Sequence, residues 1–572
     1  MSAKSDRQSN NVYKVVLVSV NAKYIHASLA ASYLLAALRE KLPVDEFSVG
    51  SVEGTINEPK DAVYHRIADE APDAVGFSCY IWNIEFVLSL AERLKKEHPG
   101  TAVILGGPEV SFNSRDILEK HEFIDFIICG EGEEALPALV SCLKEKADIP
   151  DGLCTYRDAE EIRSGKLHKL FCDPPEAFKA VTPGSFNNKL AYIEASRGCP
   201  FSCAFCLSGE KGSVRFFSLD RVKRDILTLA GSGTRTVKFV DRTFNCDKKR
   251  AQEILRFIKE NYGEAIPSGV CFHFEIAADI LDGETLALIG SMPQGSVQFE
   301  AGIQSFNLKT LQSVRRKTDL GKLTENLRTL TSFGNCHVHT DLIFGLPYED
   351  YASVKESFNR AYALGANMLQ LGFLKVLHGS FLEEKAAEYE IEYSEKPPYE
   401  VISTKWLSAD EMRKLHKIES VFDRLSNSGR FKRTLRYVLT VSGLSPFVLF
   451  EKLSEKIGNE SAVPLDVFTE QCFAFFCSLP GVDKMRLRDE MITDRIATNA
   501  SVIIPKCLQV KDSRLKTVKS FLAETYPPEK GAMRTLAVLY SSGEVIFSDH
   551  TRKDRVSGEY EIKRIKEQDC CL

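Results

Sequence analysis

Apolar and polar residues follow two different patterns along residues 13–140. Short runs of β-branched apolar residues predict buried strands, and the stretches between them, where apolar residues recur at helical spacing, predict helices. The strands are expected at 15–20, 74–77, 102–105 and 126–128, and the helices at 29–41 and 87–95. This order predicts a parallel sheet wrapped by helices, which binds ligands beyond the carboxyl ends of its strands.

The loops at those strand ends contain glycines and hydrogen-bonding side chains. Glycine lets a backbone approach a ligand closely, and polar side chains then fix the ligand's orientation. The residues that we expect to line a ligand site here are Asn21, Ser78, Tyr80, Trp82, Gly106, Gly107, Glu131 and Gly132. A generic nucleotide-binding domain shows similar loops, although no GxGxxG sequence follows the first strand.

The same alternation resumes in the middle third of the chain. Strands are predicted at 192–195, 236–241, 270–276, 297–302, 337–344 and 369–376, with helices at 248–262, 284–290, 323–333 and 351–364. Six such units predict an open, partial (β/α)6 barrel related to the TIM barrel, whose site lies at the carboxyl ends of the strands.

Polar residues stand at or near these strand ends, where a barrel site needs them. Residues two apart on a strand share a face, so Glu300 and Gln304 point to the same side. The polar residues that we expect at the barrel mouth are Asp241, Asn245, Glu275, Glu300, Gln304 and Asp341. The alternative for each carboxylate is an internal salt bridge to Arg197, Arg242 or Lys238.

The last third of the chain predicts a mostly helical cap. Helical patterns cover 410–425, 430–440, 446–457 and 465–478, and apolar runs at 535–540 and 544–548 predict a β-hairpin. Residues 413–436 are locally basic with interleaved aromatic residues. Such a stretch can bind RNA phosphates, but a solvated helix face is the more common explanation.

Composition favours a large intracellular enzyme. The chain has 572 residues, of which 44% are hydrophobic, and its sixteen cysteines suit reduced thiols better than disulfides in a protein of this size. The first residues lack the apolar run of a signal peptide, and no apolar stretch reaches the length of a bilayer span. We therefore expect a cytoplasmic protein without a membrane partner, whose terminal Cys570 and Cys571 lie in a frayed tail.

The most informative motif is a CxxxCxxC sequence made by Cys199, Cys203 and Cys206. Three thiolates can hold three corners of a [4Fe–4S] cluster and leave the fourth iron without a protein ligand. The alternative, a structural zinc site, usually needs four ligands, and no fourth ligand stands at a suitable spacing. The motif therefore predicts a cluster with one open iron.

This motif, preceded by Ser196-Arg197-Gly198 and with Phe205 directly before its last cysteine, resembles that of the radical SAM enzymes. Gly106-Gly107-Pro108 and the Gly-Glu-Gly-Glu sequence at 130–133 resemble the cobalamin-binding subset of that family. The segments 21–26, 239–245 and 371–375 resemble a subgroup of it with a C-terminal domain of unknown function. The resemblance implies a Rossmann-like cobalamin-binding domain before the barrel.

The resemblance also implies three cofactors: a [4Fe–4S] cluster, S-adenosyl-L-methionine (SAM) and cobalamin. By this likeness Phe205, Asp241, Asn245 and Asp341 belong to the SAM site, Glu275, Glu300 and Gln304 lie near the ribose or substrate, and the turn at 345–347 lies beside adenine. The first loop lacks the Asp-x-His-x-x-Gly of histidine-ligated cobalamin folds, so His26 is not expected to bind cobalt. By this likeness the loop with Tyr80 and Trp82 lies near the corrin, where Trp82 either faces the cobalt and blocks a lower ligand or is a packing aromatic.

The activity that the resemblance implies is methyl transfer to an unactivated carbon, fed by an external electron donor of the flavodoxin or ferredoxin type. A cobalamin-dependent rearrangement or cyclisation is the main alternative. A tRNA methylthiotransferase needs a second cysteine trio, but Cys79, Cys129 and Cys142 lie too far apart in the chain. A cobalamin or redox sensor without enzymatic activity would not need the polar barrel mouth.

These patterns divide the chain into five parts. We predict a disordered tail at 1–12, the cobalamin-binding domain at 13–150, a linker at 151–187, the radical SAM core at 188–395 and a C-terminal domain at 396–572.

Overall fold

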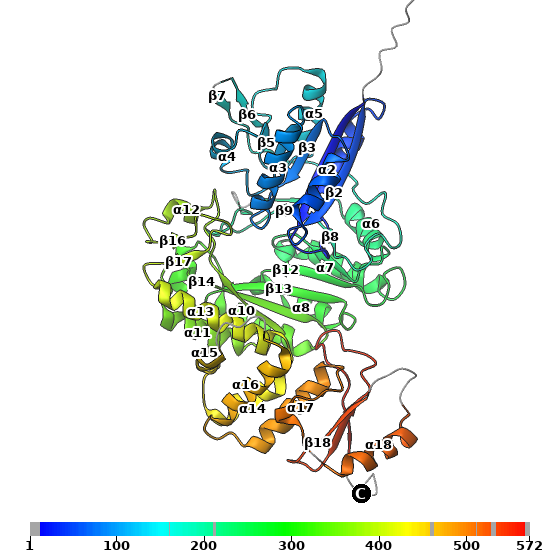
Figure 1. The fold of residues 1–572 in the computed structure, drawn as a ribbon, viewed down its shortest axis with the longest axis vertical. Coiled ribbons are helices and arrows are strands. Elements are labelled where there is room, and N and C mark those ends of the chain that lie inside the picture. The colour runs from blue at the N-terminus through cyan, green and yellow to red at the C-terminus, as the bar shows by residue number, and fades with distance from the viewer. Residues whose placement is uncertain are drawn as a thin grey trace, which may run out of the picture. The chain divides into compact units, whose positions relative to one another are not determined.

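The computed structural model describes residues 12–159, 161–209, 213–457, 463–510, 512–527 and 534–566. The chain forms two compact units, coloured by residue number in Figure 1. The first consists of Met1–Glu275, Lys375–Glu388 and Glu392–Val401, and the second of Ile276–Leu374, Tyr389–Ile391 and Ile402–Leu572. Residues 1–11 of the predicted tail, and the terminal Cys570 and Cys571, lie outside the described residues.

The first unit begins with a seven-stranded sheet of order β2-β1-β3-β4-β5-β6-β7. Its first five strands are parallel: β1 (Tyr13–Asn21), β2 (Phe47–Thr55), β3 (Ala74–Ser78), β4 (Ala102–Gly106) and β5 (Phe126–Ile128). The parallel sheet and four of these strands were predicted, but β2 was not. Antiparallel β6 (Thr155–Asp158) and β7 (Glu161–Arg163) continue the sheet. Part of the segment treated above as a linker, 151–187, thus belongs to this sheet.

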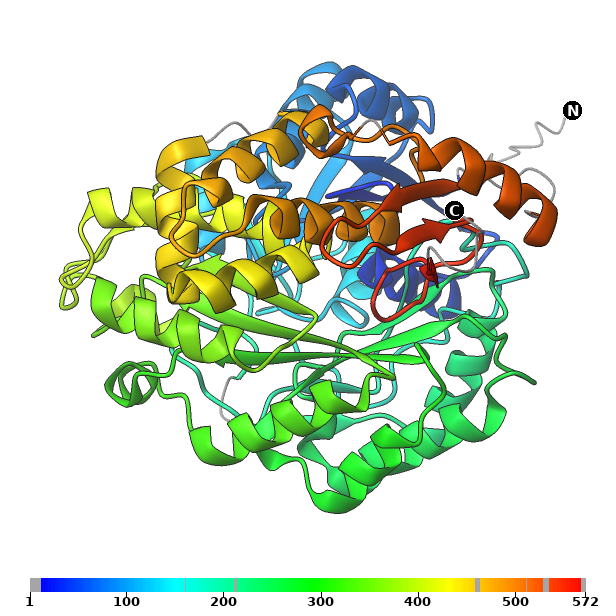
Figure 2. The same ribbon diagram turned by 90° about the horizontal axis from the view of Figure 1, so that it is seen from below.

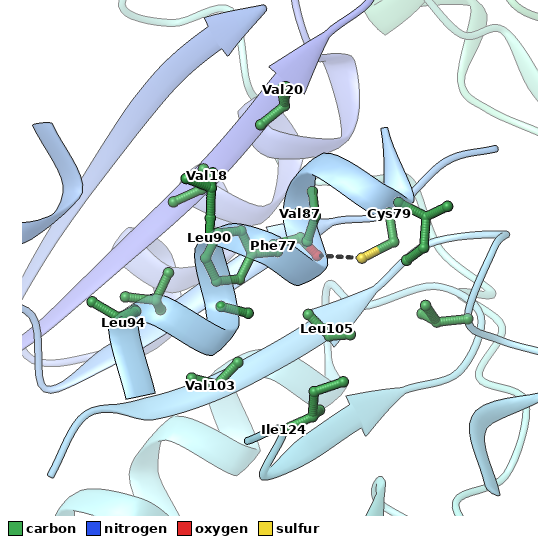
Figure 3. Close-up of a cluster of buried hydrophobic side chains, with 14 of the residues drawn as sticks. Val18, Val20, Phe77, Cys79, Val87, Leu90, Leu94, Val103, Leu105 and Ile124 are labelled. Carbon is green, nitrogen blue, oxygen red and sulfur yellow. Dashed lines mark hydrogen bonds between the residues drawn. The ribbon is translucent and has the colours of Figure 1, made fainter. Parts of the chain in front are cut away.

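Helices cover this sheet and bury its apolar rows. They are α1 (Leu29–Lys41), α2 (Lys60–Ala68), α3 (Ile84–Glu97), α4 (Ser114–Lys120) and α5 (Ala135–Glu145). Val18, Phe77 and Leu105 lie side by side in register across β1, β3 and β4, and Leu90 and Leu94 of α3 belong to the same cluster (Figure 3). Each side chain of this size contributes about 1.5–3 kcal/mol when it is buried fully.

Three barrel strands follow in the first unit. Parallel β8 (Ala191–Ile193), β11 (Thr236–Phe239) and β12 (Cys271–Ile276) alternate with α6 (Leu219–Ala230) and α7 (Lys248–Asn261). A short antiparallel pair, β9 (Ser196–Gly198) and β10 (Val214–Phe216), flanks the cysteine motif. The side chain of Asp247 caps α7 by accepting a hydrogen bond from the amide of Arg250 at 3.0 Å.

The second unit supplies three more parallel barrel strands, β13 (Val297–Gln304), β14 (His337–Phe344) and β15 (Met368–Phe373). Their helices are α8 (Gly283–Gly290), α9 (Leu308–Ser313), α10 (Leu320–Phe333) and α11 (Tyr351–Tyr362). All six predicted strand–helix units are therefore present, and the expected fold class is confirmed.

The C-terminal region packs against α11 through aromatic side chains. Phe358 of α11 lies 5.1 Å from Phe422, 5.5 Å from Phe447 and 6.0 Å from Phe450 between ring centroids, all in edge-on contact. The helices of this region are α13 (Ala409–Phe422), α14 (Lys432–Ser442), α15 (Pro446–Ile457), α16 (Leu465–Cys477), α17 (Lys484–Thr498) and α18 (Arg514–Thr525). The region is mostly helical, as predicted.

The predicted hairpin is present as β18 (Thr535–Val538) and β19 (Val545–Ser548), to which β20 (Lys563–Ile565) adds a third strand. Figure 2 shows this sheet beside α17. Helix α17 buries charged residues by pairing them: Arg488 lies 2.9 Å from Asp489, and Asp494 accepts a hydrogen bond from Thr434 Oγ1 at 2.8 Å.

Arginines of the basic segment 413–436 are engaged within the protein. Arg433 contacts Asp494 at 3.2 Å and Glu559 at 2.7 Å, and Arg413 pairs with Asp410. Whether the segment binds RNA stays untested.

A segment after the last barrel strand returns to the first unit. It contains α12 (Phe381–Lys385) and runs from Lys375 to Val401, apart from residues 389–391. The amide of Leu382 donates to the carbonyl of Ala204 at 2.9 Å, and Tyr399 Oη donates to the Glu109 carboxylate. This returning segment therefore contacts both the cysteine motif and the loop after β4.

Among the described residues, no helix has the length and apolar character that a membrane crossing requires.

Candidate functional site

A cavity of about 760 Å³ opens at the carboxyl ends of β1, β3, β4 and β5. All eight residues that were expected at a ligand site there line this cavity, namely Asn21, Ser78, Tyr80, Trp82, Gly106, Gly107, Glu131 and Gly132. Residues around the cysteine motif, including Glu194, Arg197 and Ser208, line the same cavity. One cavity thus joins the strand ends of the sheet to the cysteine loop.

The backbone of Gly107 closes one wall of the cavity tightly. Its φ angle is +118°, and a Cβ atom there would lie 2.5 Å from the carbonyl oxygen of Cys79. The amide of Cys79 in turn donates to the carbonyl of Gly106 at 2.7 Å. The loops after β3 and β4 therefore meet backbone to backbone, which only glycine permits at this position.

Tyr80 and Trp82 form an aromatic wall. Their rings stack with centroids 4.3 Å apart and 8° between planes, and Trp82 is 47% exposed. Asn83, which the sequence analysis did not identify, holds this loop, because its Nδ2 donates to the carbonyls of Val20 and Ser78 at 2.9 Å each. Asn83 is itself buried, so the aromatic pair stands on a rigid support.

His26 also lines the cavity, and it contacts a barrel strand. Its Nδ1 lies 2.5 Å from the hydroxyl of Tyr192 on β8, and Asn21 Nδ2 donates to its carbonyl at 3.2 Å. That His26 does not bind cobalt stays a prediction.

The three cysteines of the motif stand on one loop directly after β9. Cys199 Sγ lies 3.3 Å from Thr243 Oγ1, and the amide of Cys206 donates to the carbonyl of Cys203 at 3.1 Å. The half-buried Phe205 belongs to the same loop. A donor set of three thiols fits a cluster that keeps one iron open.

Asp241 anchors the segment that leads into this loop. Its carboxylate accepts hydrogen bonds from the amide of Ala195 at 2.9 Å and from Ser196 Oγ at 2.5 Å. Burial raises the pKa of Asp241 to about 7. The expected contact with SAM stays a prediction, as it does for Asn245, which is buried in the short helical turn Phe244–Cys246.

The salt-bridge alternative is present for Glu275. Its carboxylate lies 4.0 Å from Lys238 Nζ and 3.9 Å from Arg242 Nη1. These basic residues follow or belong to β11, so the group lies at one end of the strands of the first unit.

In the second unit, His339 stands between two of the predicted carboxylates. Its Nδ1 lies 3.8 Å from Glu300, and its Nε2 lies 3.0 Å from Asp341. Gln304 has a φ angle of +70° beside an irregularity in the pairing of β13 with β14. His339 was missed, although it occupies the same face of β14 as Asp341 and lies opposite Glu300 in register.

Beyond the turn at 345–347, a buried carboxylate is held by serines. Glu349 is 1% exposed and accepts hydrogen bonds from Ser305 Oγ at 2.6 Å and Ser357 Oγ at 3.2 Å. Burial raises the pKa of its carboxyl to about 7 from a usual value of 4.5. The folded state therefore binds the proton more tightly than the unfolded chain does.

This linkage predicts that the free energy of unfolding falls as the pH rises from about 4.5 to about 7. The Glu349 carboxyl contributes about 3 kcal/mol to this fall. Glu349→Gln should flatten that dependence, because glutamine carries no proton to lose. Urea unfolding of both proteins at several pH values measures the slope. Glu356→Gln on the exposed side of α11 serves as control, and an equally steep slope in Glu349→Gln would contradict the prediction.

Three family models match separate parts of the chain. Residues 15–140 match the B12 binding domain, residues 193–361 match the radical SAM superfamily, and residues 387–541 match a family of unknown function, DUF4080. The motif-based resemblance is thereby confirmed, including the C-terminal region without an assigned role.

A curated methyltransferase is similar to this chain over about half of its length. The 2-(S-pantetheinyl)-carbapenam-3-carboxylate methyltransferase of Streptantibioticus cattleyicolor is 27% identical over 335 residues, which are 51% of this chain and 45% of that relative. The chain therefore spans just under half the length of this relative.

Two solved structures share the fold. The radical SAM methyltransferase TsrM from Kitasatospora setae, with cobalamin and a [4Fe–4S] cluster bound, has a TM-score of 0.54 at 16% identity over 68% of this chain and 82% of that one. The cobalamin-dependent SAM radical enzyme OxsB, with aqua-cobalamin and SAM bound, has a TM-score of 0.58 at 14% identity over 85% of this chain and 79% of that one.

Proposed function

Because the chain belongs to the cobalamin-binding radical SAM enzymes, we propose that it transfers a methyl group to an unactivated carbon of its substrate. The cavity carries this proposal, since strand-end loops of the B12 binding domain and residues beside the cysteine motif line the same space. The carbapenam relative and TsrM are both named methyltransferases, which supports this proposal.

The cofactors of this family are cobalamin, a [4Fe–4S] cluster and SAM. Cys199, Cys203 and Cys206 would hold the cluster, and the strand-end loops around Gly107 and Trp82 would hold cobalamin. When bound, the reduced cluster supplies the electron that cleaves SAM, and cobalamin carries the methyl group.

The chain's own residues would orient these groups and exclude water. The stacked Tyr80 and Trp82 present an apolar wall, and Asp241 fixes the segment before the cysteines through Ala195 and Ser196. Holding the reacting groups in one geometry contributes to rate, and a dry site suppresses side reactions.

Product analysis tests the proposal. In one balanced turnover, substrate R–H, two SAM and two electrons give R–CH₃, S-adenosylhomocysteine, 5′-deoxyadenosine and methionine. We expect the two nucleoside products in comparable amounts when reconstituted protein is incubated anaerobically with methyl-labelled SAM and extract of its own cell. A rearrangement or cyclisation would form 5′-deoxyadenosine without S-adenosylhomocysteine or a labelled product, and that result would reject methyl transfer.

The electrons would come from an external donor of the flavodoxin or ferredoxin type. We also propose a cytoplasmic location. The fourteen cysteines among the described residues are thiols outside disulfide bonds, which suits a reducing compartment.

A further inference from the structure

Arg197 lies at the centre of a group of carboxylates on one wall of the cavity. Its Nε donates to Glu194 at 2.8 Å within its own segment. Its two terminal nitrogens donate to Glu131 at 3.2 Å and to Glu133 at 2.6 Å, both in the loop after β5. A single side chain, two residues before Cys199, therefore connects the B12 binding domain to the cysteine loop.

A second arginine binds the same loop. Arg215 of β10 lies opposite Arg197 of β9 in register, and both of its terminal nitrogens donate to Glu131. The amide of Leu170 donates to that carboxylate as well, at 2.6 Å. Burial raises the pKa of Glu131, but the donors from Arg215 and Leu170 outweigh it, so its pKa lies below the usual value.

The geometry of these ion pairs matters more than their energy. Only 13% of the Arg197 side chain and 6% of the Glu133 side chain are exposed. Buried ion pairs contribute little net stability because desolvation offsets their attraction, whereas the planar guanidinium fork fixes orientation. A network of this kind at the junction of two cofactor-binding elements therefore suits a positioning role.

We propose that Arg197, Arg215, Glu131 and Glu133 form an ionic clamp that sets the position of bound cobalamin relative to the cluster. The proposal rests on the proposed function, because only a reaction that uses both cofactors needs this spacing. Under this proposal Glu131 is a positioning residue, because its carboxylate accepts hydrogen bonds from the two arginines of the clamp. A misplacement of about 1 Å between reacting groups can cost about a hundredfold in rate.

The chain offers a matched control at the other end of the same strand. Asp125 directly precedes β5, whereas Glu131 and Glu133 follow it. Asp125 pairs with Lys95 at 2.8 Å and accepts from the amide of Val103 at 2.7 Å, and neither charged residue lines the cavity. Asp125→Asn thus removes a partly buried charge from the same domain without touching the clamp.

The test measures the magnetic coupling between the two cofactors in the holoprotein. With cobalamin as Co(II) and the cluster reduced, pulsed electron paramagnetic resonance reports their dipolar interaction, which depends on distance. We expect a narrow distribution of the distance between cobalt and cluster in the wild type and in Asp125→Asn, and a broadened distribution of that distance in Glu133→Gln. We also expect methylcobalamin formation relative to 5′-deoxyadenosine formation to fall about tenfold in Glu133→Gln only.

The outcomes separate the two proposals. A Glu133→Gln protein that keeps the wild-type distance distribution, while losing stability as Asp125→Asn does, would overturn the clamp and leave a structural role. If Glu133→Gln does not fold, Arg215→Lys takes its place, because it keeps the charge but loses the fork; the same broadening is expected and its absence overturns the clamp. A wild type that holds both cofactors without dipolar interaction would contradict the proposed function itself, and the clamp with it.

Discussion

Replacing any one of Cys199, Cys203 and Cys206 with alanine is expected to abolish reductive cleavage of SAM. Each thiolate would hold one corner of the cluster, and two protein ligands would not retain a cluster whose fourth iron must stay open. The wild type reconstituted under anaerobic conditions should contain about four irons per chain, and each variant far fewer. Iron analysis and the yield of 5′-deoxyadenosine after chemical reduction measure the two effects.

Cys142 on α5 provides the control, since it is a free, half-buried cysteine outside the motif. Cys142→Ala should keep both the iron content and the cleavage activity. Cleavage that survives in the triple variant would exclude the assignment of these three residues.

Gly107→Ala is expected to destabilise the B12 binding domain and to remove its cobalamin binding. The new Cβ would lie 2.5 Å from the carbonyl oxygen of Cys79, and the φ angle of +118° is unfavourable for alanine. The loops after β3 and β4 must then separate, at a cost of about 2–4 kcal/mol in the free energy of unfolding. Urea unfolding and titration with hydroxocobalamin, followed by absorbance, measure the two losses.

Gly50→Ala on β2 is the matched change in the same sheet. A Cβ there would meet no atom within 4 Å, so stability should change by no more than about 0.5 kcal/mol and cobalamin binding should be kept. If Gly107→Ala bound cobalamin as tightly as Gly50→Ala does, the tight approach of the two loops would have no part in binding.

Two kinds of apolar pattern made strands predictable from the sequence. The apolar run at 126–128 and the apolar residues interspersed with polar ones at 337–344 predicted strands that agree with β5 and β14 at both ends. Edge strand β2 was missed because serine, glycine and glutamate interrupt its apolar residues. Helix α17 was missed for a different reason: its charged residues indicate a surface, but they are buried because Arg488 and Asp494 find partners inside the fold.

The candidate site likewise contains features that the sequence predicts and contacts that only the fold shows. The cysteine motif could be recognised because its three ligands lie within eight residues of the chain. The partners of Glu131 and Asp241 could not, because Arg215 and Ser196 stand 84 and 45 residues away from them along the chain. Spacing identifies a metal site, but only the folded chain shows which arginine a carboxylate meets.

The returning segment limits where the C-terminal region of this chain can be exchanged for that of a relative. The family model of the C-terminal region begins at residue 387, inside a stretch whose Tyr399 bonds to Glu109 and whose Leu382 bonds to Ala204. A chimaera joined at residue 387 would therefore pair one parent's Tyr399 with the other parent's loop after β4. A junction after Val401 would keep this segment with the first unit, but the exchanged region must then also match Phe358 of α11, against which Phe422, Phe447 and Phe450 pack.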